Sequence, residues 1–141
     1  MNPMVDSLEA VPLFADVSRR DLKRLADSMK ERSFAPGDEV VAEGKSGVVF
    51  FVLLEGSARV SKGGEDRGRL TTGDYFGEMA LIDGDLRLAS VHAEEDLRCA
   101  TLTRWNFRPF VRDHPDVAWA LLTAMVKRVR EAQAPPVGTA R

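Results

Sequence analysis

The segment from Phe76 to Val91 holds the side chains whose types and spacing could bind a small ligand. Gly77 precedes Glu78, and Arg87 follows nine residues after that glutamate, where a strand is expected to begin. Glycine permits a close backbone approach or a positive φ. A helical turn over 79–82 would leave free N–H groups at its start, which suit a phosphate. A carboxylate accepts a hydrogen bond from a hydroxyl, and a guanidinium holds phosphate oxygens through two donors. The segment therefore predicts a pocket for a 3′,5′-cyclic nucleotide, which carries both groups.

Simpler interpretations of the same residues remain open at this point. Arg87 could pair with Asp83 or Asp85 on the surface, and Glu78 could be a solvated carboxylate. The sequence shows no catalytic triad, no metal-binding cluster and no paired carboxylates in a plausible cleft, so we expect neither an enzyme nor a bound cofactor or metal. Gly44-Lys45-Ser46 imitates the end of a P-loop, but a strand is expected after it, whereas a P-loop continues into a helix.

The bulk properties are those of a single globular domain. The chain has 141 residues, 44% of them hydrophobic, and a formal net charge of −2. That charge gives no field that would attract nucleic acid or an anionic membrane, and no apolar run approaches the ~20 residues of a membrane span. One cysteine, Cys99, allows no internal disulfide. We therefore expect a cytoplasmic location, with no nucleic-acid partner and no membrane partner.

The elements that must position the segment follow from turn residues and periodicity. Ser18 is expected to cap a helix over 19–30. Six short β-rich runs separated by glycines then predict an α+β, mainly β fold, an antiparallel jelly-roll barrel flanked by an N-terminal helix and C-terminal helices. The runs are 39–43, 48–54, 57–61, 67–71, 88–93 and 97–103.

The last third of the sequence returns to helical patterns. Asn106 is expected to cap a short helix with Pro109 in its first turn. Asp116 begins a longer helix with an apolar stripe, and core packing is expected around Met125 and Trp119. The stripe comprises Val117, Leu121, Leu122, Met125 and Val129. The expected organisation is a flexible lead-in over 1–10, one domain over 11–133 and a flexible tail over 134–141.

Two stretches carry a family resemblance: Phe76-Gly77-Glu78-Met79-Ala80-Leu81 and, after a short spacer, Arg87-Leu88-Ala89-Ser90-Val91. They resemble the phosphate-binding cassette of the cyclic nucleotide-binding domain family, shared by the bacterial catabolite activator protein, regulatory subunits of protein kinase A and cyclic-nucleotide-gated channels. The resemblance implies that Glu78 binds the ribose hydroxyl, Arg87 the phosphate, and that Arg128 approaches the glutamate. With the chemistry above, the expected ligand-binding residues are Gly77, Glu78, Met79, Ala80, Arg87, Leu88, Ser90, Val60 and Arg128.

Two positions depart from the family pattern. Leu86 replaces the usual proline, and Leu88 replaces a small or hydroxylated residue. Members selective for cyclic GMP are similar to one another in having threonine there, so Leu88 favours cyclic AMP over cyclic GMP. The resemblance implies a sensor in which ligand binding moves the C-terminal helix. The alternative is a protein-interaction domain of the same fold that binds no nucleotide. Expected partners are an unknown effector protein or a missing effector domain, and a second copy in a possible homodimer through the C-terminal helix.

Overall fold

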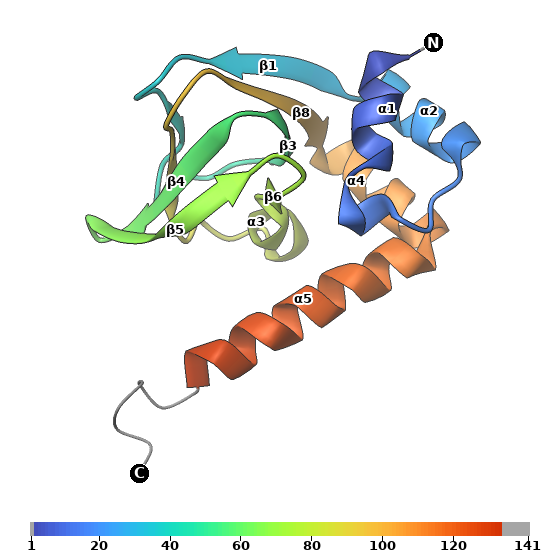
Figure 1. Cartoon of the computed structure of the whole chain (residues 1–141). Coiled ribbons are helices and arrows are strands. Elements are labelled where there is room, and N and C mark those ends of the chain that lie inside the picture. Colours follow the sequence, from blue (N-terminus) through green and yellow to red (C-terminus); the bar gives the residue numbers. More distant parts are fainter. Residues whose placement is uncertain (1, 134–141) are drawn as a thin grey trace.

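The computed structural model describes residues 2–133, which form two four-stranded antiparallel sheets with helices gathered at one end (Figure 1). One sheet has the order β1-β8-β3-β6 and the other β2-β7-β4-β5. The sheets face each other as a jelly-roll-like sandwich, so the predicted jelly roll is confirmed, although it is not a closed barrel. The strands are β1 (Lys30–Phe34), β2 (Glu39–Val41), β3 (Val49–Glu55), β4 (Ser57–Lys62), β5 (Glu65–Thr71), β6 (Tyr75–Phe76), β7 (Ser90–Ala93) and β8 (Leu97–Thr103).

Strand β3 is buried on both faces, which explains its continuous apolar sequence. Successive strand side chains point to opposite faces. Phe51 and Leu53 face the core between the sheets, where Phe51 stacks on Phe76 at 4.7 Å between ring centroids. Phe50 and Val52 face the core shared with the helices. One strand therefore joins the two cores. The expectation that Cys99 is a buried strand residue is confirmed, and burial raises the pKa of its thiol to about 12.

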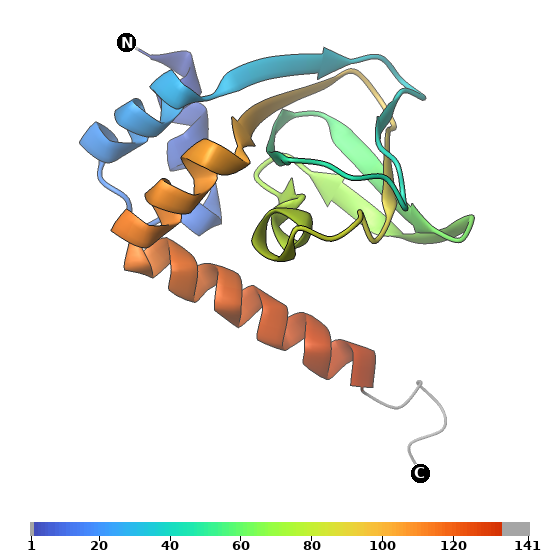
Figure 2. The ribbon, with the colours of Figure 1, turned by 180° about the vertical axis from the view of Figure 1, so that it is seen from behind.

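The helices pack on the outer face of the first sheet, mostly at one end, and the last one continues below the sheets (Figures 1 and 2). They are α1 (Pro3–Glu9), the 3₁₀ helix η1 (Pro12–Phe14), α2 (Arg19–Ser28), α3 (Glu78–Asp83), α4 (Arg104–Asp113) and α5 (Pro115–Gln133). The prediction of a flexible lead-in over 1–10 is wrong for most of that range, because α1 occupies it. Asn2 caps α1, and Val5 and Leu8 are fully buried in the core, because proline and the cap start a helix whose apolar face has a partner.

Several boundaries differ from the predicted ones. The helix capped by Ser18 ends at Ser28, and β1 follows because Met29 is already extended. Strand β1 went unpredicted because its residues are mostly charged, as is common at a sheet edge. Asn106 is not a cap: α4 begins at Arg104, and Pro109 lies in its interior. The predicted tail over 134–141 lies outside the described residues.

Helix α5 buries only part of its predicted stripe. Val117 and Leu121 are in the core, whereas Leu122 and Val129 are more than half exposed. The expected core packing is wrong for Trp119, whose side chain is 72% exposed. Beyond its first turns the helix leaves the other helices and runs below the sheets (Figure 1). No helix among residues 2–133 is long and apolar enough to cross a membrane.

The junction of α4 and α5 is tied to α2 by His114. Its Nε2 lies 3.1 Å from Asp21 Oδ2, and its Nδ1 lies 2.9 Å from Phe110 O. Partial burial lowers the pKa of His114, but the hydrogen bonds and the charges of Asp21 and Asp113 outweigh it, so the net pKa is raised. The hydrogen bond to His114 in turn lowers the pKa of Asp21.

This junction makes stability depend on pH. The pKa of His114 is higher in the folded state, so its stabilising contribution is complete below the ordinary value of 6.5 and is lost as pH rises through the folded pKa. We expect the free energy of unfolding, measured with urea, to fall more steeply from pH ~5.5 to ~8 in the wild type than in a His114→Gln variant. If the free energies of unfolding of the two proteins changed with pH in parallel, the His114–Asp21 pair would contribute nothing to the pH dependence of stability.

Candidate functional site

The segment singled out from the sequence forms a tight loop and one short helix. Gly77 stands at φ +96° between β6 and α3, and Gly84 ends α3 at φ +72°. A Cβ on Gly77 would lie 2.8 Å from both Val49 O and Arg87 Nη1. Gly77 is therefore required by its backbone conformation and by the space around it. The predicted helical turn over 79–82 is confirmed within α3.

Arg87 is buried, with 8% of its surface exposed. Its Nη2 donates to Val49 O at 2.9 Å and its Nη1 donates to Gly77 O at 3.3 Å. Burial lowers the pKa of the guanidinium, and the nearby Glu78 carboxylate opposes that change. Within residues 2–133 no ion pair joins Arg87 to Asp83 or Asp85, so the surface-pairing interpretation is wrong. A positive charge is held here by backbone carbonyls.

Gly47 makes room for this guanidinium and was not predicted. A Cβ at Gly47 would overlap the Arg87 side chain at Nη2 and Nε. Its φ is not positive, so size alone demands glycine at this position. No sequence pattern relates Gly47 to an arginine 40 residues away, because the contact exists only after the strands pair.

Glu78 joins the short helix to the long C-terminal one. The carboxylate is 3% exposed, and its Oε2 accepts a hydrogen bond from Arg128 Nη1 at 2.8 Å. Arg128 itself is half exposed and belongs to α5. The expected approach of Arg128 to the glutamate is therefore present in the structure. The half-buried Tyr75 lies close by, and its pKa is raised by burial and by the charge of Glu78.

A cavity of about 350 Å³ opens between the second sheet, α3 and α5. Seven of the nine expected residues line it: Val60, Gly77, Glu78, Met79, Ala80, Leu88 and Arg128. Arg87 stands behind its wall, bonded to the lining residue Gly77. Ser90 does not line it, and its Oγ accepts a hydrogen bond from Glu43 N at 2.9 Å. The sequence did not identify further lining residues, including Tyr75, Gly68 and Leu70.

The cavity lining combines charged and apolar groups. Glu78, Arg128 and the start of α3 are polar, β5 adds Arg67 and Arg69, and the buried charge of Arg87 lies just behind the wall. Val60, Leu70 and Leu88 supply apolar surface. A volume of this size suits a small organic molecule. Such an arrangement accommodates a molecule with an anionic group, a hydroxyl and a flat apolar part.

Residues 31–114, from β1 to the end of α4, match the sequence model of the family described as "Cyclic nucleotide-binding domain". This match covers more than half of the chain. The chain belongs to the cyclic nucleotide-binding domain family. The matched stretch contains Glu78 and Arg87, whereas Arg128 on α5 lies beyond it.

Three known proteins show how this cyclic nucleotide-binding domain relates to others. It is 37% identical over 101 residues to the cAMP-dependent protein kinase regulatory subunit of Hypocrea atroviridis, covering 72% of this chain and 22% of that protein. It is 33% identical over 117 residues to cGMP-dependent protein kinase, isozyme 1, of Drosophila melanogaster, covering 77% and 15%. The crystal structure of the Thermus thermophilus catabolite activator protein aligns with a TM-score of 0.78 at 29% identity, covering 86% and 59%.

The domain therefore shares its family and its fold with these proteins, and the resemblance expected from the sequence is confirmed. It spans less than a quarter of the length of the two curated relatives. Among residues 2–133, no group of three or more histidines, cysteines and carboxylates is placed to hold a metal ion.

Proposed function

We propose that the domain binds cyclic AMP in the cavity beside α3 and passes on its occupancy through α5. The observation that carries this proposal is that a buried carboxylate and a buried guanidinium meet at Gly77: Glu78 follows it in the chain, and Arg87 Nη1 donates to its carbonyl oxygen. Membership of the cyclic nucleotide-binding domain family supports the ligand class. The relative named as a cAMP-dependent kinase subunit supports the adenine nucleotide.

Arg87 is the proposed phosphate-binding residue. The protein has already removed this charge from water, and its hydrogen-bond partners are two neutral carbonyl oxygens. A phosphate offers a charged acceptor to the remaining donors, which makes a stronger hydrogen bond than a neutral one. The backbone N–H groups of Ala80 and Leu88 would complete the phosphate site. A bound phosphate would therefore offset the desolvation free energy of the buried Arg87 guanidinium.

Glu78 is the proposed partner of the ribose 2′-hydroxyl, and it couples the ligand to α5. The carboxylate already accepts a hydrogen bond from Arg128. A bound ribose shares or displaces that hydrogen bond, so occupancy changes the interaction that fixes Arg128 and its helix. A ligand shifts such an equilibrium only through different affinities for the two helix positions. The Glu78–Arg128 contact provides that difference.

The base is proposed to lie against Val60 and Leu88. Leu88 has no hydroxyl to donate to or accept from a guanine edge, and its side chain is half exposed. The apolar surface therefore favours adenine over guanine. Contrary to the expectation from the sequence, the proposed function makes no use of Ser90, whose Oγ accepts a hydrogen bond from the backbone N–H of Glu43.

Titration calorimetry with cyclic AMP and cyclic GMP tests the function. We expect cyclic AMP to bind at least about tenfold more tightly than cyclic GMP, a difference of about 1.4 kcal/mol. A concentration about 100 times the dissociation constant should stabilise the fold by about 2.7 kcal/mol in a thermal-shift assay. Equal affinities would reject the proposed role of Leu88. An absence of heat and of thermal shift with both nucleotides would favour the nucleotide-independent interaction domain.

We also propose that α5 pairs with a second copy of the chain. Four exposed apolar residues follow one another at intervals of three and four along the helix: Trp119, Leu122, Val126 and Val129. That spacing places them on one stripe, as in a two-helix seam. Sedimentation of the calorimetry samples, with a Val126→Glu variant as control, measures this association. A wild type that remains monomeric would reject it.

A further inference from the structure

Helix α4 carries a row of arginines that the nucleotide site does not use. Arg104, Arg108 and Arg112 stand at intervals of four residues, so they lie along one side of the helix. Arg108 and Arg112 are exposed. Across residues 2–133, none of the three forms an ion pair, whereas Arg19, Arg59, Arg67, Arg69, Arg98 and Arg128 each do. The chain as a whole is slightly acidic, so three arginines in one row are a local concentration of positive charge.

The row separates two hollows in the surface. The first, about 550 Å³, is bounded by all three arginines together with Val48, Trp105 and Pro109. The second, about 410 Å³, is bounded by Arg108 and Arg112 together with Leu81, Ile82, Phe107 and Val111. We call these two hollows and the row between them the arginine groove.

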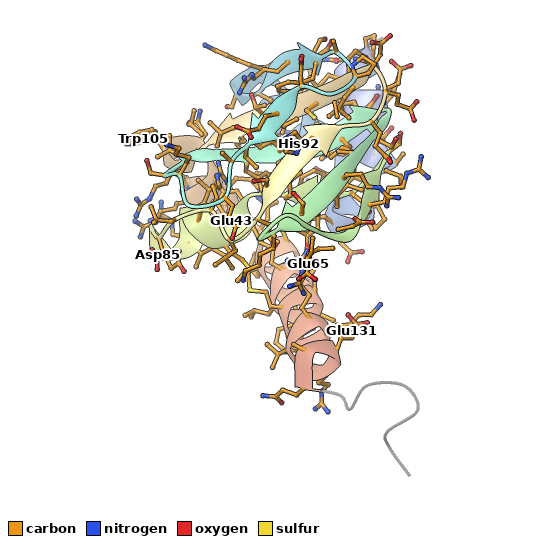
Figure 3. The ribbon with its side chains drawn as sticks, turned by 90° about the vertical axis from the view of Figure 1, so that its left-hand side faces the viewer. Glu43, Glu65, Asp85, His92, Trp105 and Glu131 are labelled. Carbon is orange, nitrogen blue, oxygen red and sulfur yellow. The ribbon has the colours of Figure 1, made fainter. Side chains whose placement is uncertain are left out.

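Large apolar side chains stand exposed at the rims of the arginine groove. Trp105 is 70% exposed, Ile82 55% and Val48 43%. Figure 3 shows Trp105 and Asp85 at the same outer edge of the molecule. Exposed aromatic and arginine side chains together are typical of the energetic centre of a protein interface.

From this juxtaposition we propose that the arginine groove binds an acidic amphipathic helix of a partner protein. Carboxylates at intervals of four residues on such a helix match the spacing of the arginines, and each pair can form a two-donor hydrogen bond. Apolar side chains flanking the carboxylates fill the two hollows. Because Leu81 and Ile82 belong to α3, the partner would touch the helix that begins at Glu78.

The shape and charge of the groove favour a helix over a lipid surface. A flat bilayer cannot fill two separate hollows. Arg104 Nη1 lies within 3.8 Å of the Cβ position at Gly84, so the flanking Asp83 and Asp85 bring negative charge to that rim. Those carboxylates oppose a broad anionic sheet but leave the row of Arg108 and Arg112 open to a narrow acidic segment.

The test uses a fluorescent peptide of ~15 residues, about four helical turns, with glutamates every fourth residue and leucines flanking them. A matched peptide has glutamine for each glutamate. The full chain is compared with the triple variant Arg104→Glu, Arg108→Glu, Arg112→Glu by fluorescence anisotropy. The control triple variant Arg20→Glu, Lys23→Glu, Lys62→Glu carries the same charge change at exposed positions elsewhere. Thermal unfolding of all three proteins checks that the fold is retained.

We expect the acidic peptide to bind the wild type and the control variant with similar affinity. It should bind the groove variant at least about tenfold more weakly, and its binding to the wild type should weaken at higher salt. The glutamine peptide should bind at least about tenfold more weakly than the acidic one. Equal binding to both triple variants would overturn the proposal, as would no binding to the wild type. Arginine-dependent binding to vesicles containing phosphatidylserine, or to duplex DNA, without binding of the peptide would also overturn it. If the groove variant fails to fold, the single variant Arg108→Glu replaces it, with an expected loss of at least about threefold.

Discussion

An Arg87→Ala variant should bind cyclic AMP at least about 100-fold more weakly than the wild type, because it removes the charged partner of a desolvated phosphate. Arg87 is almost fully buried and fixed by Val49 O and Gly77 O. Among residues 2–133, no other positively charged side chain takes the place of Arg87 behind the cavity wall. Calorimetric titration of the two proteins measures the change directly.

Two further variants separate charge from geometry at this position. Arg87→Lys keeps the charge but loses the planar pair of donors, so its affinity should fall between those of the wild type and the alanine variant. Arg20→Ala, on the exposed face of α2, should bind normally. The titrations are run where unfolding curves show each variant to be folded, because two hydrogen bonds to carbonyls are lost. Unchanged affinity in Arg87→Ala would reject the phosphate site.

Replacing Gly56 by alanine should lower the free energy of unfolding by about 2 to 5 kcal/mol, the sum of backbone strain and overpacking. Gly56 joins β3 to β4 at φ +98°. A Cβ there would overlap Asp96 O and lie 3.1 Å from Leu97 Cα. Both contacts are with backbone at the start of β8, so neither can move away without disturbing the central strand pair.

Gly64 provides the matched control for this substitution. It has a similar φ of +81°, but a Cβ there would meet nothing within 4 Å. Gly64→Ala should therefore lose only about 1 to 2 kcal/mol, the cost of the left-handed backbone. Urea unfolding of both variants separates the two contributions. A loss at Gly56 no larger than that at Gly64 would mean that the chain relaxes around the added methyl group.

The sequence predicted what depends on local pattern. The run from 48 to 54 read as a strand because every residue in it is apolar, and β3 is indeed buried on both faces. Gly77 and Glu78 were found because their neighbours in the chain form one short motif. Charged β1 had no such pattern, and its strand exists because β8 offers a partner.

Long-range contacts account for what the sequence could not predict. Nothing near Ser90 indicates that its hydroxyl bonds to Glu43, 47 residues away. Core packing was expected around Trp119, but α5 leaves the other helices before that side chain can be covered. Gly47 reaches Arg87 only through the tertiary fold, across 40 residues of sequence. Residue type indicated the ligand, whereas tertiary contacts determined which groups remain available to it.

The burial of Cys99 has a practical consequence. A thiol with a pKa of about 12 is almost entirely unreactive toward maleimides near neutral pH. A cysteine introduced at Glu131 on α5 and another at Glu65 on the hairpin, both on the surface in Figure 3, would therefore take fluorophores without mutation of the native thiol. Energy transfer between the dyes would then follow the distance between helix and hairpin in an otherwise unaltered chain.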